Sequence, residues 1–201
     1  MLTDPVLWPL VLTALLGGYL SGSVPYGLIL GKMAGLGDIR ASGSGNIGAT
    51  NVLRVGGKKL AAATLLLDAL KGTVPVLVAA RFGMDYALLA ALGAFLGHLF
   101  PVWLKFKGGK GVATSLGVIF GLSWQLGIIL CLVWVVVAYV SKYSSLSALA
   151  AFAMAPFLSI ALTQDLHMFS LMVFITILVF IKHRANIKRL LDRTEGKINF
   201  G

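Results

Sequence analysis

Long apolar runs alternate with short polar segments along most of this chain. Several runs reach the roughly 20 residues that an α-helix needs to cross a lipid bilayer. They have no polar face of the kind that a water-exposed helix keeps, so the pattern indicates helices surrounded by lipid or by one another. Seven membrane helices are expected, at 6–31, 60–80, 86–104, 113–122, 124–140, 146–162 and 166–181.

Two of these helices need a separate argument. The first contains Pro25, which removes a backbone hydrogen bond, and we expect a kink there. The 29 residues 112–140 are too few for two full crossings, but Ser123-Trp124-Gln125 interrupts them and Lys110 and Lys142 flank them. Cations at both ends favour an even number of crossings. We therefore expect a short helix that turns back into a longer one, and a single long tilted helix is the alternative.

Lysine and arginine residues concentrate in the segments that fall on one side of this pattern. Arg81 lies on the opposite side and Lys71 lies inside a span. The apolar runs predict an all-α, polytopic helix bundle. Its orientation follows from the cations, which gather on the cytoplasmic side of membrane proteins. Its N-terminus would be outside, its C-terminus cytoplasmic, and residues 1–201 would form one domain. Of the 17 cations, 15 share the predicted cytoplasmic side, at 32–59, 105–111, 142 and 182–201.

Composition supports this reading and narrows the function. Only 12% of the residues are charged and 58% are hydrophobic, against about 25% charged in a soluble domain. The net charge of +10 could suggest nucleic acid, but the cations lie between apolar runs, so no nucleic-acid partner is expected. Cys131 is the only cysteine, and no His, Cys and carboxylate cluster predicts a metal site. No basic segment precedes the first apolar run, so we expect a span there rather than a cleaved signal peptide.

The first polar segment is rich in glycine and in neutral donors. It fits the spacing G-x-G-x-x-G, but no strand precedes it and Asp68 lies within an apolar run, so a dinucleotide site is rejected. Glycines still allow backbone N–H groups to approach an anion, and a helix that begins near Asn46 would favour a phosphate at its N-terminus. A flexible linker is the alternative. The residues that would bind phosphate here are Gly43, Ser44, Gly45, Asn46, Gly48, Thr50, Asn51 and Arg54.

A second glycine segment, Gly108-Gly109-Lys110-Gly111, precedes an expected helix. It is not a Walker A loop, because Gly111 stands where that loop requires Ser or Thr. The N–H groups of Gly108, Gly109 and Gly111 together with the Lys110 ammonium would nevertheless form a site for an anion. A membrane anchor with turn glycines is the alternative reading.

Other polar residues are weaker signals when each is taken alone. Ser144, Ser145 and Ser147 precede an apolar run and are ordinary helix caps. If the last membrane helix continues, His183 and Asn186 share a face because they are three residues apart. Asp68 and Lys71 have the same spacing inside a span, where an ion pair is the expected arrangement, and His98 is expected to be a buried core residue.

Taken together, these segments resemble the bacterial acyl-phosphate-dependent glycerol-3-phosphate acyltransferases. The resemblance runs from about Gly22 to about Leu191, and the motifs occur in the same order; the tail past Asp192 adds nothing to it. The matching stretches are 42–51, Asp68-x-x-Lys71-Gly72, Gly97-His98, 106–114 and His183-Arg184-x-Asn186-Ile187.

The resemblance implies a seven-span enzyme of the bacterial inner membrane, with its active site on the cytoplasmic side. Such enzymes transfer a fatty acyl group from acyl phosphate to the 1-hydroxyl of glycerol 3-phosphate, in the first acylation of phospholipid biosynthesis. It implies contact with membrane lipid and a soluble upstream enzyme that makes acyl phosphate. No cofactor is implied. The family's functional positions fall on Ser44, Arg54, Lys110, Ser145, His183 and Asn186.

The residues agree with this chemistry, because two phosphorylated substrates need two anion sites. The sequence leaves open which glycine segment takes which substrate. It also leaves open whether His183 or the leaving phosphate accepts the hydroxyl proton. A small transporter of a phosphorylated anion is the alternative function, although no internal repeat typical of transporters is visible.

Overall fold

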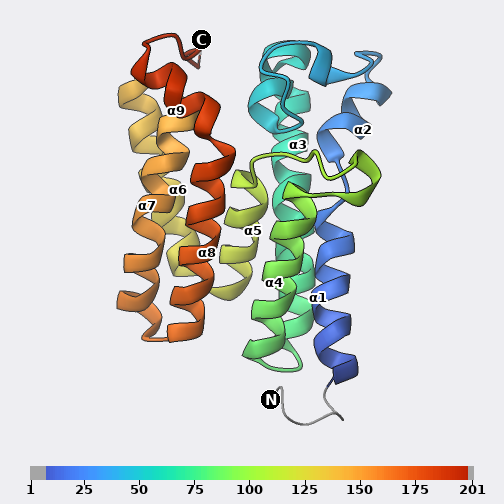
Figure 1. The fold of residues 1–201 in the computed structure, drawn as a ribbon, viewed down its shortest axis with the longest axis vertical. Coiled ribbons are helices and arrows are strands. Elements are labelled where there is room, and N and C mark those ends of the chain that lie inside the picture. The colour runs from blue at the N-terminus through green and yellow to red at the C-terminus, as the bar shows by residue number, and fades with distance from the viewer. Residues whose placement is uncertain (1–7, 199–201) are drawn as a thin grey trace. The chain divides into compact units, whose positions relative to one another are not determined.

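The computed structural model describes residues 8–198, and this part of the chain consists of helices and loops without strands (Figure 1). The all-helical prediction is therefore confirmed for these residues, while Val6 and the last three residues lie outside them. Within residues 8–198, five helices are long and apolar enough to cross a membrane, or up to six when a bent pair near the C-terminus counts as one span. The chain divides into an N-terminal unit, which ends at Leu122, and a C-terminal unit, which begins at Ser123.

The N-terminal unit brings α1, α3 and α4 side by side and packs α5 against α3 and α4 (Figure 1). Glycines make the close approaches possible. A side chain at Gly22 or Gly97 would overlap the facing backbone, as would one at Gly117. Its elements are α1 Trp8–Gly22, α2 Tyr26–Met33, η2 Ile39–Ala41, α3 Ala49–Ala80, α4 Met84–Leu99, η3 Val102–Leu104 and α5 Val112–Leu122.

The structure confirms the kink at Pro25 and moves two predicted boundaries. The first expected helix is broken between α1 and α2, directly before Tyr26. The second expected helix begins at Ala49 rather than at residue 60, and it bends at Gly57, whose φ of 81° is left-handed. The third ends at Leu99 rather than at residue 104, because Pro101 cannot donate the next helical hydrogen bond.

The C-terminal unit contains α6 Trp124–Ser141, α7 Ser144–Thr163, α8 Leu166–Lys182 and α9 Arg184–Leu191. Here α7 packs against both α6 and α8. The Ser123 hydroxyl caps α6 by accepting a hydrogen bond from Leu126 N at 3.4 Å, so the run 112–140 is broken as predicted and is not one continuous helix. The last expected span, 166–181, matches α8 within one residue, and the chain then bends by 60° between α8 and α9.

Candidate active site

The buried side-chain amide of Asn51 holds the first glycine segment against the start of α3. Asn51, in the first turn of α3, is fully buried, and its Oδ1 accepts hydrogen bonds from Ser44 N at 2.7 Å and from Ser44 Oγ at 3.2 Å. Its Nδ2 donates to Ile39 O at 2.8 Å. Left-handed backbone at Gly43 and Gly45 makes the tight turn that brings Ser44 back to the helix. Asn51 therefore positions Ser44, while Ser44 itself lies exposed.

We expect Asn51→Ala to loosen this segment and to destabilise the protein. Ile39 is buried, and leaving its carbonyl without a hydrogen bond costs about 1–3 kcal/mol. The thermal midpoint of the purified protein in detergent should fall, whereas Gln125→Ala, which truncates an exposed amide, should leave it unchanged. An unchanged midpoint for Asn51→Ala would show that Ser44 is held by other contacts.

The turn before this segment is fixed by a local ion pair. The Asp38 carboxylate accepts from Arg40 N at 3.0 Å and pairs with the Arg40 guanidinium at 2.6 Å. These hydrogen bonds lower the pKa of Asp38 to about 2. The turn places the carbonyl of Ile39 where Asn51 can donate to it. The helix α3 then begins at Ala49, close to Asn46, with Gly48 as its N-cap.

The second glycine segment lies on the end of α4, and its hydrogen bonds correct one expectation. Gly108 N donates to Leu99 O at 3.2 Å and Gly109 N donates to His98 O at 3.1 Å. These two N–H groups attach the segment to α4 and are not available to bind phosphate directly. Gly111, at φ 87°, turns the chain into α5. The donors that this segment offers to an anion are thus Lys110 and the first N–H groups of α5.

Two hydroxyls in the first turn of α5 were not singled out from the sequence. Thr114 Oγ1 and Ser115 Oγ are both buried, and neither has a hydrogen-bond partner within residues 8–198. Buried hydroxyls are ordinarily paired, so these are further candidate donors at the same helix N-terminus. The sequence feature that could have identified these two hydroxyls is their position just after the glycine segment.

A cluster of polar side chains in the C-terminal unit meets at one carboxylate. Glu195 Oε1 accepts hydrogen bonds from Ser145 Oγ at 2.7 Å and from Asn186 Nδ2 at 2.6 Å. Its Oε2 accepts from Arg189 Nε at 2.6 Å. The structure thus brings the expected residues Ser145 and Asn186 together, although they are far apart in sequence.

Glu195 was overlooked in the sequence, where the tail past Asp192 had no role. It is the only glutamate in the sequence and lies among the cations of the tail. These two features could have identified it as the partner of a polar cluster. Burial raises the pKa of Glu195, but the hydrogen bonds from Ser145, Asn186 and Arg189 lower it more, and the net shift is downward. The carboxylate is therefore ionised at neutral pH.

His183 lies at the bend between α8 and α9 and is buried. Its Nδ1 is 2.8 Å from Val179 O, so in the neutral ring Nδ1 carries the proton that this carbonyl accepts. In that tautomer Nε2 is the basic nitrogen. The condition of a continuous helix is not met because the chain bends here, yet both His183 and Asn186 are buried.

The expected site residues divide between the two units. In the part of the chain that the structure describes, no three His, Cys, Asp or Glu side chains gather in a way that could hold a metal ion. The C-terminal unit contributes Ser145, His183 and Asn186. The N-terminal unit contributes Gly43, Ser44, Gly45, Asn46, Gly48, Thr50, Asn51, Arg54, Gly108, Gly109, Lys110 and Gly111.

Comparison with known proteins gives consistent matches over nearly the whole chain. Residues 12–193 match the family model described as glycerol-3-phosphate acyltransferase. Proteins with that name from Mesorhizobium japonicum and Brucella canis are 60% and 57% identical, over 94% of this chain and 96% and 94% of theirs.

Two crystal structures are similar in fold. Both are of PlsY (YgiH), an integral membrane glycerol 3-phosphate acyltransferase. The glycerol 3-phosphate form has a TM-score of 0.88 and 37% identity, and it covers 96% of both chains. The lysophosphatidic acid form has a TM-score of 0.87 and 36% identity, and it covers 94% of this chain and 95% of the other.

Proposed function

Because this chain belongs to the glycerol-3-phosphate acyltransferase family, we propose that it transfers a fatty acyl group from acyl phosphate to the 1-hydroxyl of glycerol 3-phosphate. The products are 1-acylglycerol 3-phosphate (lysophosphatidic acid) and phosphate. The observation that carries the proposal is the similarity, along almost the entire chain, to an enzyme crystallised with glycerol 3-phosphate and with lysophosphatidic acid. These two molecules differ by one acyl group, as the substrate and the product of this reaction must.

The residues support acyl phosphate as the donor. Both reactants then carry a phosphate, and the N-terminal unit has two glycine segments, each followed by the N-terminus of a helix. An acyl phosphate is already activated, so the protein must mainly align the reactants and stabilise charge. Alignment alone can supply about 7–11 kcal/mol of the barrier. No cofactor is needed for such a transfer.

In the reaction, the 1-hydroxyl oxygen forms a bond to the acyl carbonyl carbon and the bond from that carbon to phosphate breaks. Lys110 and the start of α5 hold one phosphate, and Ser44, Asn46, Thr50 and Arg54 hold the other. Ser145 and Asn186 orient polar groups of the substrates. The hydroxyl proton passes to Nε2 of His183, whose Nδ1 is occupied by Val179 O.

We place this chemistry at the cytoplasmic face of the bacterial inner membrane. The 15 cations on one side of the sequence pattern support seven crossings, with the N-terminus outside and the C-terminus inside. The acyl chain then lies in the membrane while the two phosphates meet the cytoplasmic loops. Acyl phosphate would be supplied by a separate soluble enzyme.

The direct test incubates the purified protein in detergent with acyl phosphate and glycerol 3-phosphate. We expect one phosphate released for each acylglycerol phosphate formed, and no product when acyl-CoA replaces acyl phosphate. Passage of glycerol 3-phosphate across liposomes without any acylated product would instead identify a transporter. Product formation from acyl-CoA alone would overturn the proposed donor.

His183→Gln tests the proposed base. Loss of a general base costs typically 10²–10⁴-fold in rate, so we expect kcat to fall by about that factor. A general base must be unprotonated to act, so the wild-type rate should decline in acid and the variant should lose this dependence. His167→Gln, which changes an exposed histidine, is the matched control. Full activity of His183→Gln would assign the proton to the leaving phosphate.

A further inference from the structure

The second glycine segment rests on a buried histidine. Gly109 is buried against the His98 ring, and a methyl group added at Gly109 would overlap His98 Nε2 and its neighbouring ring carbons. The backbone of the same histidine accepts the hydrogen bond from Gly109 N at 3.1 Å. His98 therefore limits how close the segment can come to α4 and also attaches it there.

His98 is in turn one member of a buried charged group. Asp68 Oδ1 is 2.7 Å from Lys71 Nζ, which confirms the expected ion pair, and 4.0 Å from His98 Nδ1. All three side chains are at most 3% exposed. Together they connect α3 to the end of α4, directly beneath the glycine segment.

Lys71 extends this group to the break between α1 and α2. Its ammonium donates to Val24 O at 2.7 Å and lies 5.8 Å from the centre of the Tyr26 ring. The Ser21 hydroxyl donates to the carbonyl of Lys71 at 2.8 Å. Residues of α1, α2, α3 and α4, together with Val24 at the break, thus meet at this group.

A gain in folding stability does not by itself explain why this charged group is buried. Removing two charges from water costs about as much as their attraction returns, and well-packed neutral replacements are often as stable. A charged group with one good geometry does, however, fix the relative positions of the elements that supply it. None of the roles assigned above to substrate contact uses Asp68, Lys71 or His98.

We propose that Asp68, Lys71 and His98 are positioning residues for phosphate binding. They fix the distance between the second glycine segment and the end of α4. This distance in turn determines the position of Lys110 and of the first N–H groups of α5. This inference rests on the proposed function for its substrate, but the geometry that it concerns can be tested with inorganic phosphate alone.

A double-mutant cycle between Gly109 and His98 tests the contact. Gly109→Ala should displace the segment, raise KM for the substrate held there by at least tenfold, and reduce the thermal stabilisation that inorganic phosphate gives. Adding His98→Ala removes the ring that the new methyl group would strike, so the double variant should bind phosphate better than Gly109→Ala alone. Purely additive effects would overturn the proposal. His167→Ala, which truncates an exposed histidine, should behave as wild type.

A second variant separates positioning from folding. Asp68→Asn combined with Lys71→Met removes both charges and leaves neither one buried without its partner. We expect its thermal midpoint without ligand to stay within a few degrees of wild type, while its affinity for inorganic phosphate falls at least tenfold. A folded double variant with unchanged phosphate affinity refutes the proposal, and so does one whose midpoint and affinity fall together. Wild type that binds phosphate without catalysing acyl transfer would refute only the proposed function.

Discussion

Lys110→Ala is expected to lower the rate of acyl transfer by about 10³-fold in a protein that still folds. Lys110 is partly buried and stands between Gly109 and the N-terminus of α5, where the ammonium adds a full charge to the N–H donors of the helix. The N–H groups of Gly108 and Gly109 are bonded to α4, so the segment depends on this side chain more than the sequence suggested. Loss of one aligned donor typically lowers kcat by about 10²–10³-fold, and loss of a charged donor should reach the upper end of that range.

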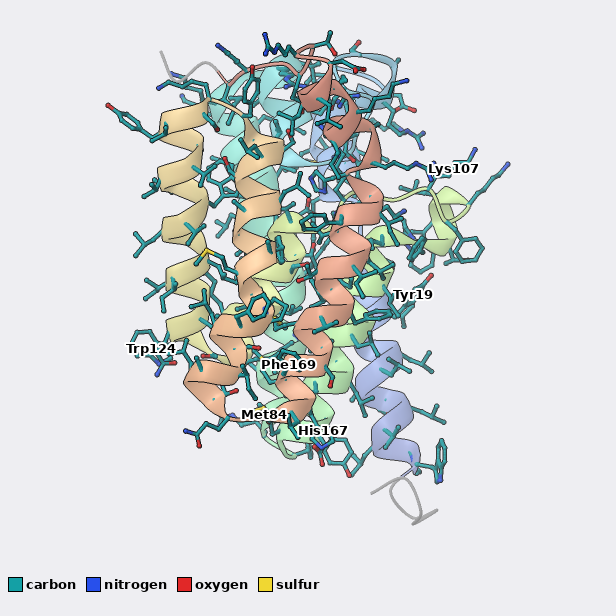
Figure 2. The ribbon with its side chains drawn as sticks, turned by 60° about the vertical axis from the view of Figure 1, so that its left-hand side comes forward. Tyr19, Met84, Lys107, Trp124, His167 and Phe169 are labelled. Carbon is teal, nitrogen blue, oxygen red and sulfur yellow. The ribbon has the colours of Figure 1, made fainter. Side chains whose placement is uncertain are left out.

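The measurement is the rate of acylglycerol phosphate formation by Lys110→Ala protein whose thermal midpoint matches that of wild type. Lys107→Ala is the matched control, because Lys107 belongs to the same loop but is exposed and extends away from the helices of its unit (Figure 2). It should retain most of the activity. Lys110→Arg keeps the charge with a different shape and should recover only part of the rate. Activity retained by Lys110→Ala would remove this residue from the mechanism.

The second large effect is expected for Glu195→Gln. The carboxylate accepts three hydrogen bonds at once, from Ser145, Asn186 and Arg189. An amide of the same shape has one oxygen and one NH₂ group, so at least one donor would face another donor. Each buried donor left unpaired costs about 1–3 kcal/mol, and Ser145 and Asn186 would no longer be fixed relative to each other. We expect a lower thermal midpoint and a loss of activity of about 100-fold, since displacement of aligned groups by about 1 Å can have that effect.

The same network predicts a dependence of stability on pH. The pKa of Glu195 is lowered on folding from its ordinary value of 4.5, so its stabilising contribution is fully present above that pH. The contribution is lost as the pH falls through the lowered pKa of the folded protein. The difference in thermal midpoint between wild type and Glu195→Gln should thus be large at pH 7 and shrink in this acidic range.

Asp192→Asn is the control for both experiments, because Asp192 is an exposed acid in the same tail. It should change neither the activity nor the dependence on pH. If Glu195→Gln matched wild type in activity and in thermal midpoint, the carboxylate would have no part in holding Ser145 and Asn186.

The sequence by itself determined the helices and the breaks between most of them. Apolar runs mark helices because each backbone polar group in lipid must be paired within its own helix, which is a local requirement. The break at Ser123 and the kink at Pro25 follow from residues at those positions, and the pair of Asp68 and Lys71 follows from helical spacing. The glycine segments, together with the resemblance that they carry, also pointed to the family.

Only the tertiary structure decided how the site residues are held. The bonds from Gly108 and Gly109 to α4, the clamp of Asn51 on Ser44, and the meeting of Ser145 with Glu195 join residues that no local pattern connects. Such contacts depend on where helices cross and on where the chain bends, as it does at His183. Periodicity reports which face of a helix is apolar, but it contains no information on which distant side chain will meet a given polar group.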